Sequence, residues 1–415
     1  MVSYEDFVHL DYKPKHSDIL TSFRIGGLSE STSFKRGAGA VAAESSIGTW
    51  TELTTTKPYM MNLAAKVYDI NPIDKDSAFI KIAYPIELFE YGNLPNILSS
   101  IAGNVFGMKE VRDLRFIDLE LPKDIVNCYD GPKYGLDGVR KITGVKNRPL
   151  IGTIVKPKLG LNTKDHAKVA YDAWSGGCDI VKDDENLSSQ NFNKFDARLK
   201  ETLKMKRKAE KETGEKKMYM INVTAETVEM LKRAKLVERS GNEYAMVDIL
   251  TVGWSALQTL RNADFKLVLH AHRAGHAALD KVPYHGIKMK VLARLTRLIG
   301  MDQLHIGTAV GKMFETKEEV LENLEALKDE FHGLKKVMPV ASGGLQPSMV
   351  PQLIDTFGKD VIIQMGGGIH GHPKGTIAGA KAARAAVDGI SEGLTLQEAA
   401  RKSKELKEAL EHWKQ

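Results

Sequence analysis

The second part of the sequence repeats one pattern eight times, and this repetition restricts the fold more than any other feature. From about residue 145 onward, short apolar segments that predict strands alternate with amphipathic segments that predict helices. Eight consecutive strand–helix units over roughly 240 residues have the order and length of a (β/α)8 barrel, the TIM barrel. The predicted strands are Leu150–Val155, Asp179–Lys182, Met218–Val223, Ala245–Leu250, Lys266–His272, Gln303–Gly307, Val337–Ser342 and Asp360–Met365.

The residues before this repeat predict a separate domain. Ala78–Tyr84 reads as a strand, whereas Ala38–Ala43 and Leu94–Phe106 read as helices, which is an irregular α+β pattern. The turn-rich stretch Tyr129–Pro132 marks the change, and Thr395–Trp413 reads as a terminal helix. A chain of 415 residues is too long for one ordinary core. We therefore predict an α/β protein with an N-terminal α+β domain at residues 1–130, a TIM-barrel catalytic domain at 131–390 and a helical tail at 391–415.

Composition restricts the partners. The net charge of +6 is mild for this length; it favours a small anionic substrate and makes no case for nucleic acid. The lysine-rich stretch Lys204–Lys217 reads either as an RNA-binding patch or as a solvated helix face. The interleaved Glu210, Glu212 and Glu215 favour the solvated face.

Cysteine usage and hydropathy bear on the compartment. Cys128 and Cys178 lie far apart and outside any CxxC pattern, so we expect no disulfide framework and a reducing cytoplasm. The N-terminal residues lack a basic segment followed by an apolar run. No stretch approaches the roughly 18 apolar residues of a membrane span, so no membrane partner is expected.

Polar residues gather at the C-terminal ends of the eight predicted strands. Active sites of TIM barrels lie on that face, where the loops converge. In chain order these ends carry Lys156-Pro157-Lys158, Lys182-Asp183-Asp184-Glu185, Asn222, Asp248, His270-Ala271-His272-Arg273, His305, Ser342-Gly343-Gly344 and Gly366-Gly367-Gly368. Polar groups at nearly every end predict one active site at the mouth of the barrel.

The run Lys182 to Glu185 predicts a Mg²⁺ site. Carboxylates are the hard oxygen ligands that Mg²⁺ prefers, and alternation along a strand points Lys182 and Asp184 the same way. The alternative is a Lys–Asp ion pair closing the barrel mouth. A lysine beside two carboxylates helps to bind a metal only if its charge is removed, and carbamylation by CO₂ would do this.

Two further groups of residues predict anion sites. The glycine loops after strands seven and eight expose backbone N–H groups where this fold usually binds phosphate, although tight turns would also explain them. Arg273, with His272 and His305 near the ends of strands five and six, can hold a second anion, so a bisphosphate fits. His270, His272 and His276 could instead form a zinc cluster, but no matched spacing completes it.

The loop Gly307-Thr308-Ala309-Val310-Gly311-Lys312 follows strand six. Small residues flank one lysine, as in many closing lids, and the alternative is a plain surface loop.

Several of these motifs resemble those of a known family. The chain is similar over nearly its full length to the large subunit of ribulose-1,5-bisphosphate carboxylase/oxygenase (RuBisCO), and most of all to the compact archaeal form III. The motifs are Gly152–Gly160, Gly176–Asn186, His272–Ala274, His305–Thr308, Ala341–Gly344 and Gly366–Gly368, with Ala43–Trp50 and Gly103–Gly107 in the N-terminal domain.

The resemblance implies a metal site and acid–base groups. Lys182 would be carbamylated by CO₂ and would bind Mg²⁺ together with Asp184 and Glu185. Lys156 would manage the C3 proton of the substrate and later protonate the product, with Lys158 in support.

The resemblance also implies substrate contacts. His272 would contact the sugar hydroxyls, and Ser342 would bond one of them. Arg273 and His305 would hold one phosphate. The other phosphate would be held by Thr49, Trp50, Gly343, Gly344, Gly366 and Gly367. Lys312, paired with Glu44, would stabilise the incoming carboxylate, and Asn104 would touch the metal-bound substrate.

In the resembled family, residues equivalent to Glu44, Thr49, Trp50 and Asn104 come from the neighbouring subunit. A homo-oligomer, at least a dimer, is therefore expected. The implied reaction adds CO₂ to the Mg-bound enediolate of ribulose-1,5-bisphosphate and gives two 3-phosphoglycerates. The resemblance also implies O₂ as a competing substrate, so the protein would be a lyase with an oxidoreductase (monooxygenase) side activity.

The lid departs from the family pattern. Lys312 is followed by Met313-Phe314-Glu315-Thr316, so the expected glycine is missing and the acid has moved by one position. We expect this change to affect lid closure and the discrimination between CO₂ and O₂.

Two alternatives remain: a RuBisCO-like enolase or isomerase acting on a related phosphorylated sugar, and an inactive barrel with a role in assembly. The first typically lacks several of the groups present here, namely Glu44, Asn104, Lys156, Lys312 and Ser342. The Lys182–Asp184–Glu185 cluster argues against the second, since buried charges without a function are costly.

Overall fold

The computed structural model describes residues 3–28, 32–51, 53–310 and 314–413. Its contacts divide the chain into two compact units. Unit 1 comprises Met1–Asp130 and Gly275–Leu298, and unit 2 comprises Gly131–Ala274 and Ile299–Gln415. Unit 1 therefore includes a segment, residues 275–298, that lies between the two segments of unit 2 in the sequence.

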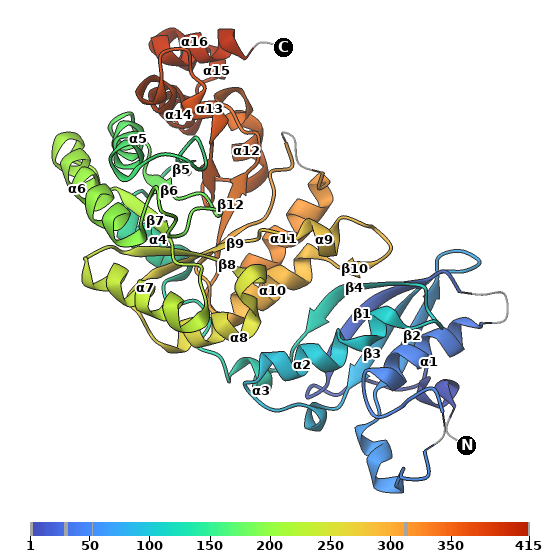
Figure 1. The fold of residues 1–415 in the computed structure, drawn as a ribbon. Helices are drawn as coiled ribbons and strands as arrows, with labels where there is room; N and C mark the ends of the chain where they lie inside the picture. Colours follow the sequence, from blue (N-terminus) through green and yellow to red (C-terminus); the bar gives the residue numbers. More distant parts are fainter. Residues whose placement is uncertain (1–2, 29–31, 52, 311–313, 414–415) are drawn as a thin grey trace. The chain divides into compact units, whose positions relative to one another are not determined.

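Unit 1 is built on a five-stranded sheet in the order β10-β4-β1-β3-β2 (Figure 1). β1 (Ile19–Gly26) runs antiparallel to β3 (Ala78–Tyr84) and β4 (Asp113–Glu120), while β2 (Lys66–Pro72) pairs with β3, and β10 (Gly286–Ile287) runs parallel to β4. Its helices are α1 (Phe34–Glu44), α2 (Leu94–Ile101), α3 (Lys123–Val126) and α9 (Ala277–Asp280), and α10 (Met289–Ile299) belongs to it up to Leu298. Four 3-10 helices complete it: η1 (Tyr4–Phe7), η2 (Pro58–Leu63), η3 (Ile86–Leu88) and η4 (Asn104–Gly107).

Unit 2 is a closed barrel of eight parallel strands, which confirms the predicted fold. Neighbouring strands follow in the order β11-β12-β13-β5-β6-β7-β8-β9. Each lies within or next to a predicted segment: β5 (Leu150–Ile154), β6 (Ile180–Lys182), β7 (Met218–Asn222), β8 (Tyr244–Asp248), β9 (Val268–His272), β11 (Gln303–His305), β12 (Met338–Ser342) and β13 (Ile362–Gln364).

Helices follow the strands and lie outside the barrel (Figure 1). They are α5 (Thr163–Ser175), α6 (Phe195–Thr213), α7 (Thr227–Arg239), α8 (Ile249–Asn262), α11 (Lys317–Lys328), α12 (Val350–Phe357) and α14 (Thr376–Ser391). α4 (Gly135–Thr143) precedes the barrel, whereas η5 (Pro347–Met349), α13 (Gly367–His370), α15 (Leu396–Lys402) and α16 (Lys404–His412) lie in its last third. Local signals start these helices: the Asn162 side chain accepts hydrogen bonds from two N–H groups of α5, and Thr316 forms a capping box with Glu319 at α11.

The barrel interior is packed with apolar side chains and is not a pore. Fully buried residues from seven of the strands and from α4 form one cluster, whose members are Val139, Leu150, Ile180, Met218, Met220, Tyr244, Met246, Val268, Met338, Val340 and Ile362. This packing makes the barrel a rigid support, so the strand ends hold their side chains in fixed positions.

Two predicted helices are shorter in the structure. The helix expected over Leu94–Phe106 ends at Ile101, and the backbone turns at Gly103. Glycine permits this turn, since a Cβ there would lie 2.1 Å from the carbonyl oxygen of Ser99. The tail is broken at Ser403, whose extended backbone ends α15 and whose hydroxyl accepts from Leu406 N–H to start α16.

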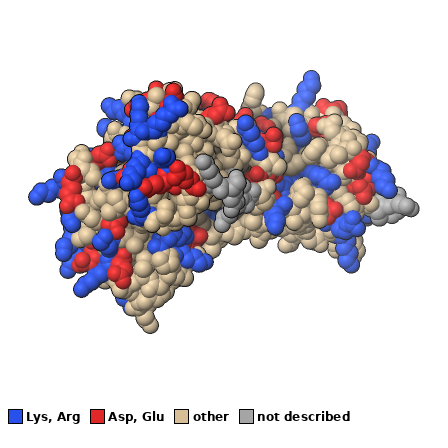
Figure 2. Space-filling model, turned by 90° about the horizontal axis from the view of Figure 1, so that it is seen from above, with Lys and Arg blue, Asp and Glu red and all other residues tan. Residues whose placement is uncertain are grey.

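Residues 204–213 of the lysine-rich stretch form the second half of α6, and several of its charges are paired. Lys206 Nζ lies 2.7 Å from Glu243 Oε2 and 3.6 Å from Glu210 Oε1, and Lys208 pairs with Glu212. Figure 2 shows basic and acidic side chains intermixed over the visible face. This agrees with the solvated-face interpretation. Among the helices of the described ranges, none has the length and apolar character needed to cross a membrane.

Candidate active site at the barrel mouth

The end of β6 places three charged side chains at the mouth of unit 2. Lys182 is buried, and its Nζ donates to the Asp183 carbonyl oxygen at 2.8 Å and lies 3.4 Å from Glu185 Oε2. Asp184 is also buried and accepts from Lys156 Nζ at 2.8 Å, across from β5. Burial alone would raise the pKa of Glu185, but the nearby Lys182 and His272 outweigh it and hold that pKa at about 2. Glu185 is therefore a carboxylate at neutral pH.

Asp183 points the other way and anchors this strand end. It is fully buried, and its carboxylate accepts from Arg198 Nε of α6 at 3.0 Å, from Tyr219 Oη at 2.7 Å and from Asn222 N–H at 3.1 Å. His166 Nε2 of α5 lies 3.1 Å away. Burial opposes ionisation, yet the Arg198 guanidinium and these donors hold the pKa of Asp183 well below its usual range. Side chains thus alternate along this strand as predicted: Asp183 points into the barrel wall, whereas Lys182 and Asp184 lie at the mouth.

The end of β9 supplies a histidine and an arginine. His272 Nδ1 lies 2.7 Å from Asp248 Oδ1 at the end of β8, and its Nε2 lies 3.5 Å from Glu185 Oε2. Asp248 therefore orients the His272 ring toward Glu185. Arg273 forms an ion pair with Glu315, and both side chains are almost fully buried. Glu315 is the acid whose position in the sequence departs from the family pattern. Its carboxylate therefore pairs with Arg273, the arginine that is predicted to bind phosphate.

His305 and Ser342 belong to a row of hydrogen bonds. His305 Nδ1 lies 2.6 Å from Ser342 Oγ, and its Nε2 lies 2.9 Å from His270 Nε2. His270 Nδ1 in turn lies 2.9 Å from Gln303 Oε1. Both ring nitrogens of His305 thus have partners within the protein, and its role as a phosphate ligand stays a prediction.

The glycine loops after β12 and β13 face the same cavity. Gly343 and Gly344 adopt φ values of 125° and 70°, which side chains rarely tolerate. A Cβ on Gly366 would lie 3.3 Å from Lys156 Cε, so a glycine there lets Lys156 pass close to the loop. His370, at the end of α13, bonds Thr153 Oγ1 of β5 at 3.0 Å and ties this loop to the strand that carries Lys156.

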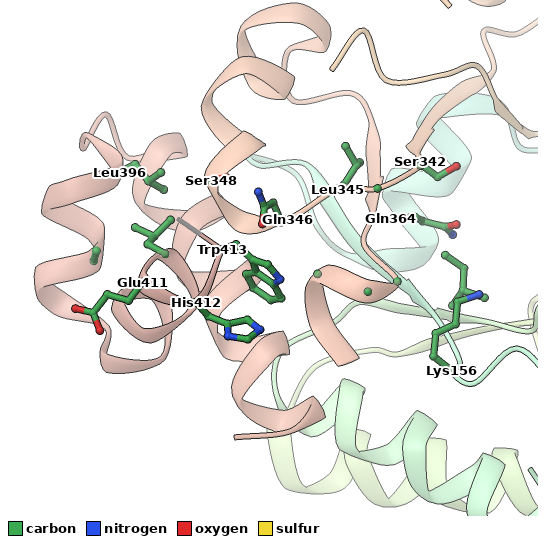
Figure 3. A pocket seen from close by; sticks show the side chains of 18 of the residues that line it. Lys156, Ser342, Leu345, Gln346, Ser348, Gln364, Leu396, Glu411, His412 and Trp413 are labelled. Atoms are coloured by element: carbon green, nitrogen blue, oxygen red, sulfur yellow. The ribbon is translucent and has the colours of Figure 1, made fainter. Parts of the chain in front are cut away.

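A cavity of about 1710 Å³ joins these groups. Its lining includes Lys156, Lys182, Glu185, His272, His305, Ser342 and the two glycine loops. The cavity continues to α15 and α16, where Leu396, His412 and Trp413 line it (Figure 3). This volume accommodates a small phosphorylated molecule with room to spare. Lys158 lies exposed in the loop beyond Lys156.

The other predicted site residues lie in unit 1 or outside the described residues. Glu44, Thr49, Trp50 and Asn104 belong to unit 1, where Glu44 accepts a hydrogen bond from Tyr4 Oη at 2.8 Å and Trp50 is 77% exposed. Gly311 and Lys312 lie outside the described residues, so the predicted lid lysine stays a prediction.

The donor set for a metal is incomplete without Lys182. Within the described ranges, no three His, Cys, Asp or Glu side chains are grouped so that they could hold a metal ion. The zinc alternative therefore has no support, because His270 bonds His305 and Gln303 whereas His272 bonds Asp248. Asp184 and Glu185 supply two hard oxygen ligands, and the buried Lys182 amine would have to become an anion to supply a third.

Sequence reasoning missed several supporting residues. Arg198, His166 and Tyr219, which hold Asp183, lie within helices and a strand interior and carry no motif. The sequence pattern indicates only that Gln303 begins a strand. The register between β9 and β11 places it directly opposite His270. Glu315 was noted as displaced, but its partner Arg273 could not be read from the sequence.

Comparison with known proteins covers both units. Residues 6–125 match the family model of the ribulose bisphosphate carboxylase large chain, N-terminal domain, and residues 135–413 match that of its catalytic domain. A ribulose bisphosphate carboxylase of Methanocaldococcus jannaschii is 48% identical over 432 aligned residues, which cover 99% of this chain and all of the relative. That of Methanosarcina mazei is 49% identical and covers 98% of this chain and 99% of the relative.

Solved structures agree. An octameric ribulose-1,5-bisphosphate carboxylase/oxygenase from Pyrococcus horikoshii OT3, in complex with sulfate, superimposes with a TM-score of 0.95 at 44% identity, covering 99% of this chain and 97% of the other. A dimeric archaeal Rubisco from Hyperthermus butylicus gives a TM-score of 0.92 at 43% identity, with 99% of both chains covered.

Proposed function

This chain belongs to the ribulose bisphosphate carboxylase large-chain family, and from that premise we propose that it carboxylates ribulose-1,5-bisphosphate. One CO₂ and one water are added to the five-carbon bisphosphate, and cleavage gives two molecules of 3-phosphoglycerate. The observation that carries the proposal is the barrel mouth itself. It combines Lys156, Lys182, Glu185 and His272 with a glycine cradle in one cavity, and Lys156 in turn bonds Asp184. The relatives of that name match over nearly the full length.

We propose Mg²⁺ as the cofactor, held by Asp184, Glu185 and a carbamate of Lys182. The fit rests on the donor chemistry: two carboxylates lie beside a buried amine, and Lys182 Nζ is 3.4 Å from Glu185. The Lys182 ammonium first loses a proton, and addition of CO₂ to the neutral amine releases a second one, so a cation is replaced by an oxygen anion. Bound there, Mg²⁺ would polarise a substrate carbonyl and stabilise negative charge on oxygen.

The remaining groups bind the substrate and move its protons. Lys156 Nζ lies 2.8 Å from Asp184 Oδ2 at the mouth, and Lys156 would take and return the proton at C3 of the substrate. Arg273 would hold one phosphate through its planar fork, and the loops at Gly343–Gly344 and Gly366–Gly367 would hold the other through backbone N–H groups. His272, oriented by Asp248, and Ser342 would bond the sugar hydroxyls between them.

The site is proposed to be completed by a second copy of the chain. The solved relatives are described as dimeric and octameric. A homo-oligomer would let Glu44, Thr49, Trp50 and Asn104 of one copy face the barrel mouth of another, with Lys312 as the lid lysine. We also propose a competing oxygenase reaction with O₂. A cytoplasmic location is proposed as well, and the two unbridged cysteines support it.

The test supplies purified protein with Mg²⁺, labelled bicarbonate and ribulose-1,5-bisphosphate without oxygen. Labelled 3-phosphoglycerate is expected. Its absence would overturn the carboxylase proposal, and conversion of the sugar without label would instead indicate an enolase or isomerase. Lys182→Ala should abolish the activity, whereas Lys168→Ala, on the exposed face of α5, should leave it unchanged. With ¹³CO₂, a carbamate NMR signal should appear in the parent protein and be absent from Lys182→Ala.

A further inference from the structure

A row of four side chains runs from the cavity into the barrel wall. It begins at Ser342 on β12, passes through His305 on β11 and His270 on β9, and ends at Gln303 on β11. The three successive distances are 2.6, 2.9 and 2.9 Å. Ser342 and His305 line the cavity, while His270 and Gln303 are completely buried. Neither His270 nor Gln303 reaches the cavity, so neither has a direct role in the chemistry proposed above.

Both histidines are neutral. Burial is the main cause that lowers the pKa of His270 and that of His305 well below the usual range, and the nearby Lys182 adds to it. A neutral imidazole carries one N–H donor and one acceptor nitrogen. Each histidine in the row must therefore donate to one neighbour and accept from the other, so all hydrogens in the row point the same way.

Gln303 determines which way that is. Its Oε1 faces His270 Nδ1, and an amide oxygen can only accept. His270 then donates from Nδ1 and accepts at Nε2, so His305 donates from Nε2 and accepts at Nδ1. The only donor left for His305 Nδ1 is the Ser342 hydroxyl, which points its hydrogen into the wall.

The direction matters at the cavity. A Ser342 hydroxyl that has donated its hydrogen inward presents only oxygen lone pairs to a bound molecule. It accepts a hydrogen bond from a substrate hydroxyl and repels an oxygen that carries no hydrogen. With the opposite direction, Ser342 would donate into the cavity and select the opposite partner.

We propose that His270 and Gln303 are positioning residues that fix the tautomer of His305, and through it make Ser342 a dedicated hydrogen-bond acceptor for a sugar hydroxyl. The substrate identity rests on the proposed function, whereas the tautomers do not. The direction would be reversed if the Gln303 amide were turned so that its NH₂ group faced His270.

The direct test measures the tautomers in the whole, unliganded protein. Histidine-selective ¹⁵N labelling and solid-state NMR distinguish protonated from unprotonated ring nitrogens among the 12 histidines. Gln303→Met and Ser342→Ala assign the two signals by shifting them. We expect protonation at Nδ1 of His270 and at Nε2 of His305. The opposite pair of tautomers, or a doubly protonated ring in either residue, would overturn the proposal whether or not the protein is a carboxylase.

The functional test removes the acceptor at Gln303. Gln303→Met does this at similar volume and introduces no charge beside His270. One neutral hydrogen bond corresponds to about a tenfold effect, so we expect kcat/KM for ribulose-1,5-bisphosphate to fall about tenfold in Gln303→Met.

A double-mutant cycle distinguishes an effect of Gln303 on Ser342 from a purely structural role of Gln303. In a Ser342→Ala background the hydroxyl is absent, so Gln303→Met should cost less than about twofold. An equal loss in both backgrounds would show that Gln303 acts through the fold alone. No loss in either background would show that the row does not control Ser342.

Discussion

Glu315 should compete with the substrate for Arg273. The two side chains form an almost fully buried ion pair, with exposed fractions of 3% and 5%. A phosphate that binds the Arg273 guanidinium must displace the Glu315 carboxylate. Breaking this ion pair makes the binding of the phosphate less favourable. Removing one partner of a buried pair costs about 3–5 kcal/mol, because the other charge is left uncompensated. Glu315→Gln should therefore lower the free energy of unfolding of the unliganded protein by about 3 kcal/mol.

The same substitution should tighten substrate binding. If the phosphate recovers about 1.4 kcal/mol at the uncompensated Arg273, the Kd for ribulose-1,5-bisphosphate falls about tenfold. Calorimetric titration without Mg²⁺ and CO₂ measures this Kd without turnover. Glu318→Gln, an exposed acid in the first turn of α11, is the matched control. It should lower the free energy of unfolding by less than about 1 kcal/mol and leave Kd unchanged. An unchanged or weaker Kd in a folded Glu315→Gln protein would refute the competition, and would mean that phosphate and Glu315 do not share Arg273.

Three further predictions concern the supporting residues. Asp248→Asn should reduce kcat by about tenfold or more, because an amide holds the His272 ring less firmly in one tautomer; steady-state kinetics would check this, and unchanged kcat would contradict it. Burial, with Lys156 nearby, lowers the pKa of His370 to about 4, so the unfolded chain binds more protons between pH 6.5 and 4. The free energy of unfolding should fall by about 3 kcal/mol as pH drops through that window, and denaturant titrations of His370→Gln should lack this loss. Arg198→Met should lower the free energy of unfolding by about 3–5 kcal/mol, because it leaves Asp183 buried without its cation; a loss below about 1 kcal/mol in denaturant titrations would contradict this.

Much of the fold could be predicted because the signals are local. Apolar segments of strand length that alternate with amphipathic helices specify the eight βα units, and covalent adjacency places Lys156, Lys182 and Ser342 at strand ends. In a parallel barrel all C-terminal strand ends meet on one face, so the site followed from the fold. The helix boundaries at Gly103 and Ser403 were missed, because the first depends on a close backbone approach and the second on a single capping hydroxyl.

The sequence by itself therefore determined the barrel, the face that carries the site and the charged residues that line it. Only the tertiary structure decided which of these residues touch: Asp248 with His272, Glu315 with Arg273 and Gln303 with His270. These partners are 24, 42 and 33 residues apart in the chain. No local propensity encodes such pairs, because they arise from the register between strands and the path of the loops once the barrel has closed.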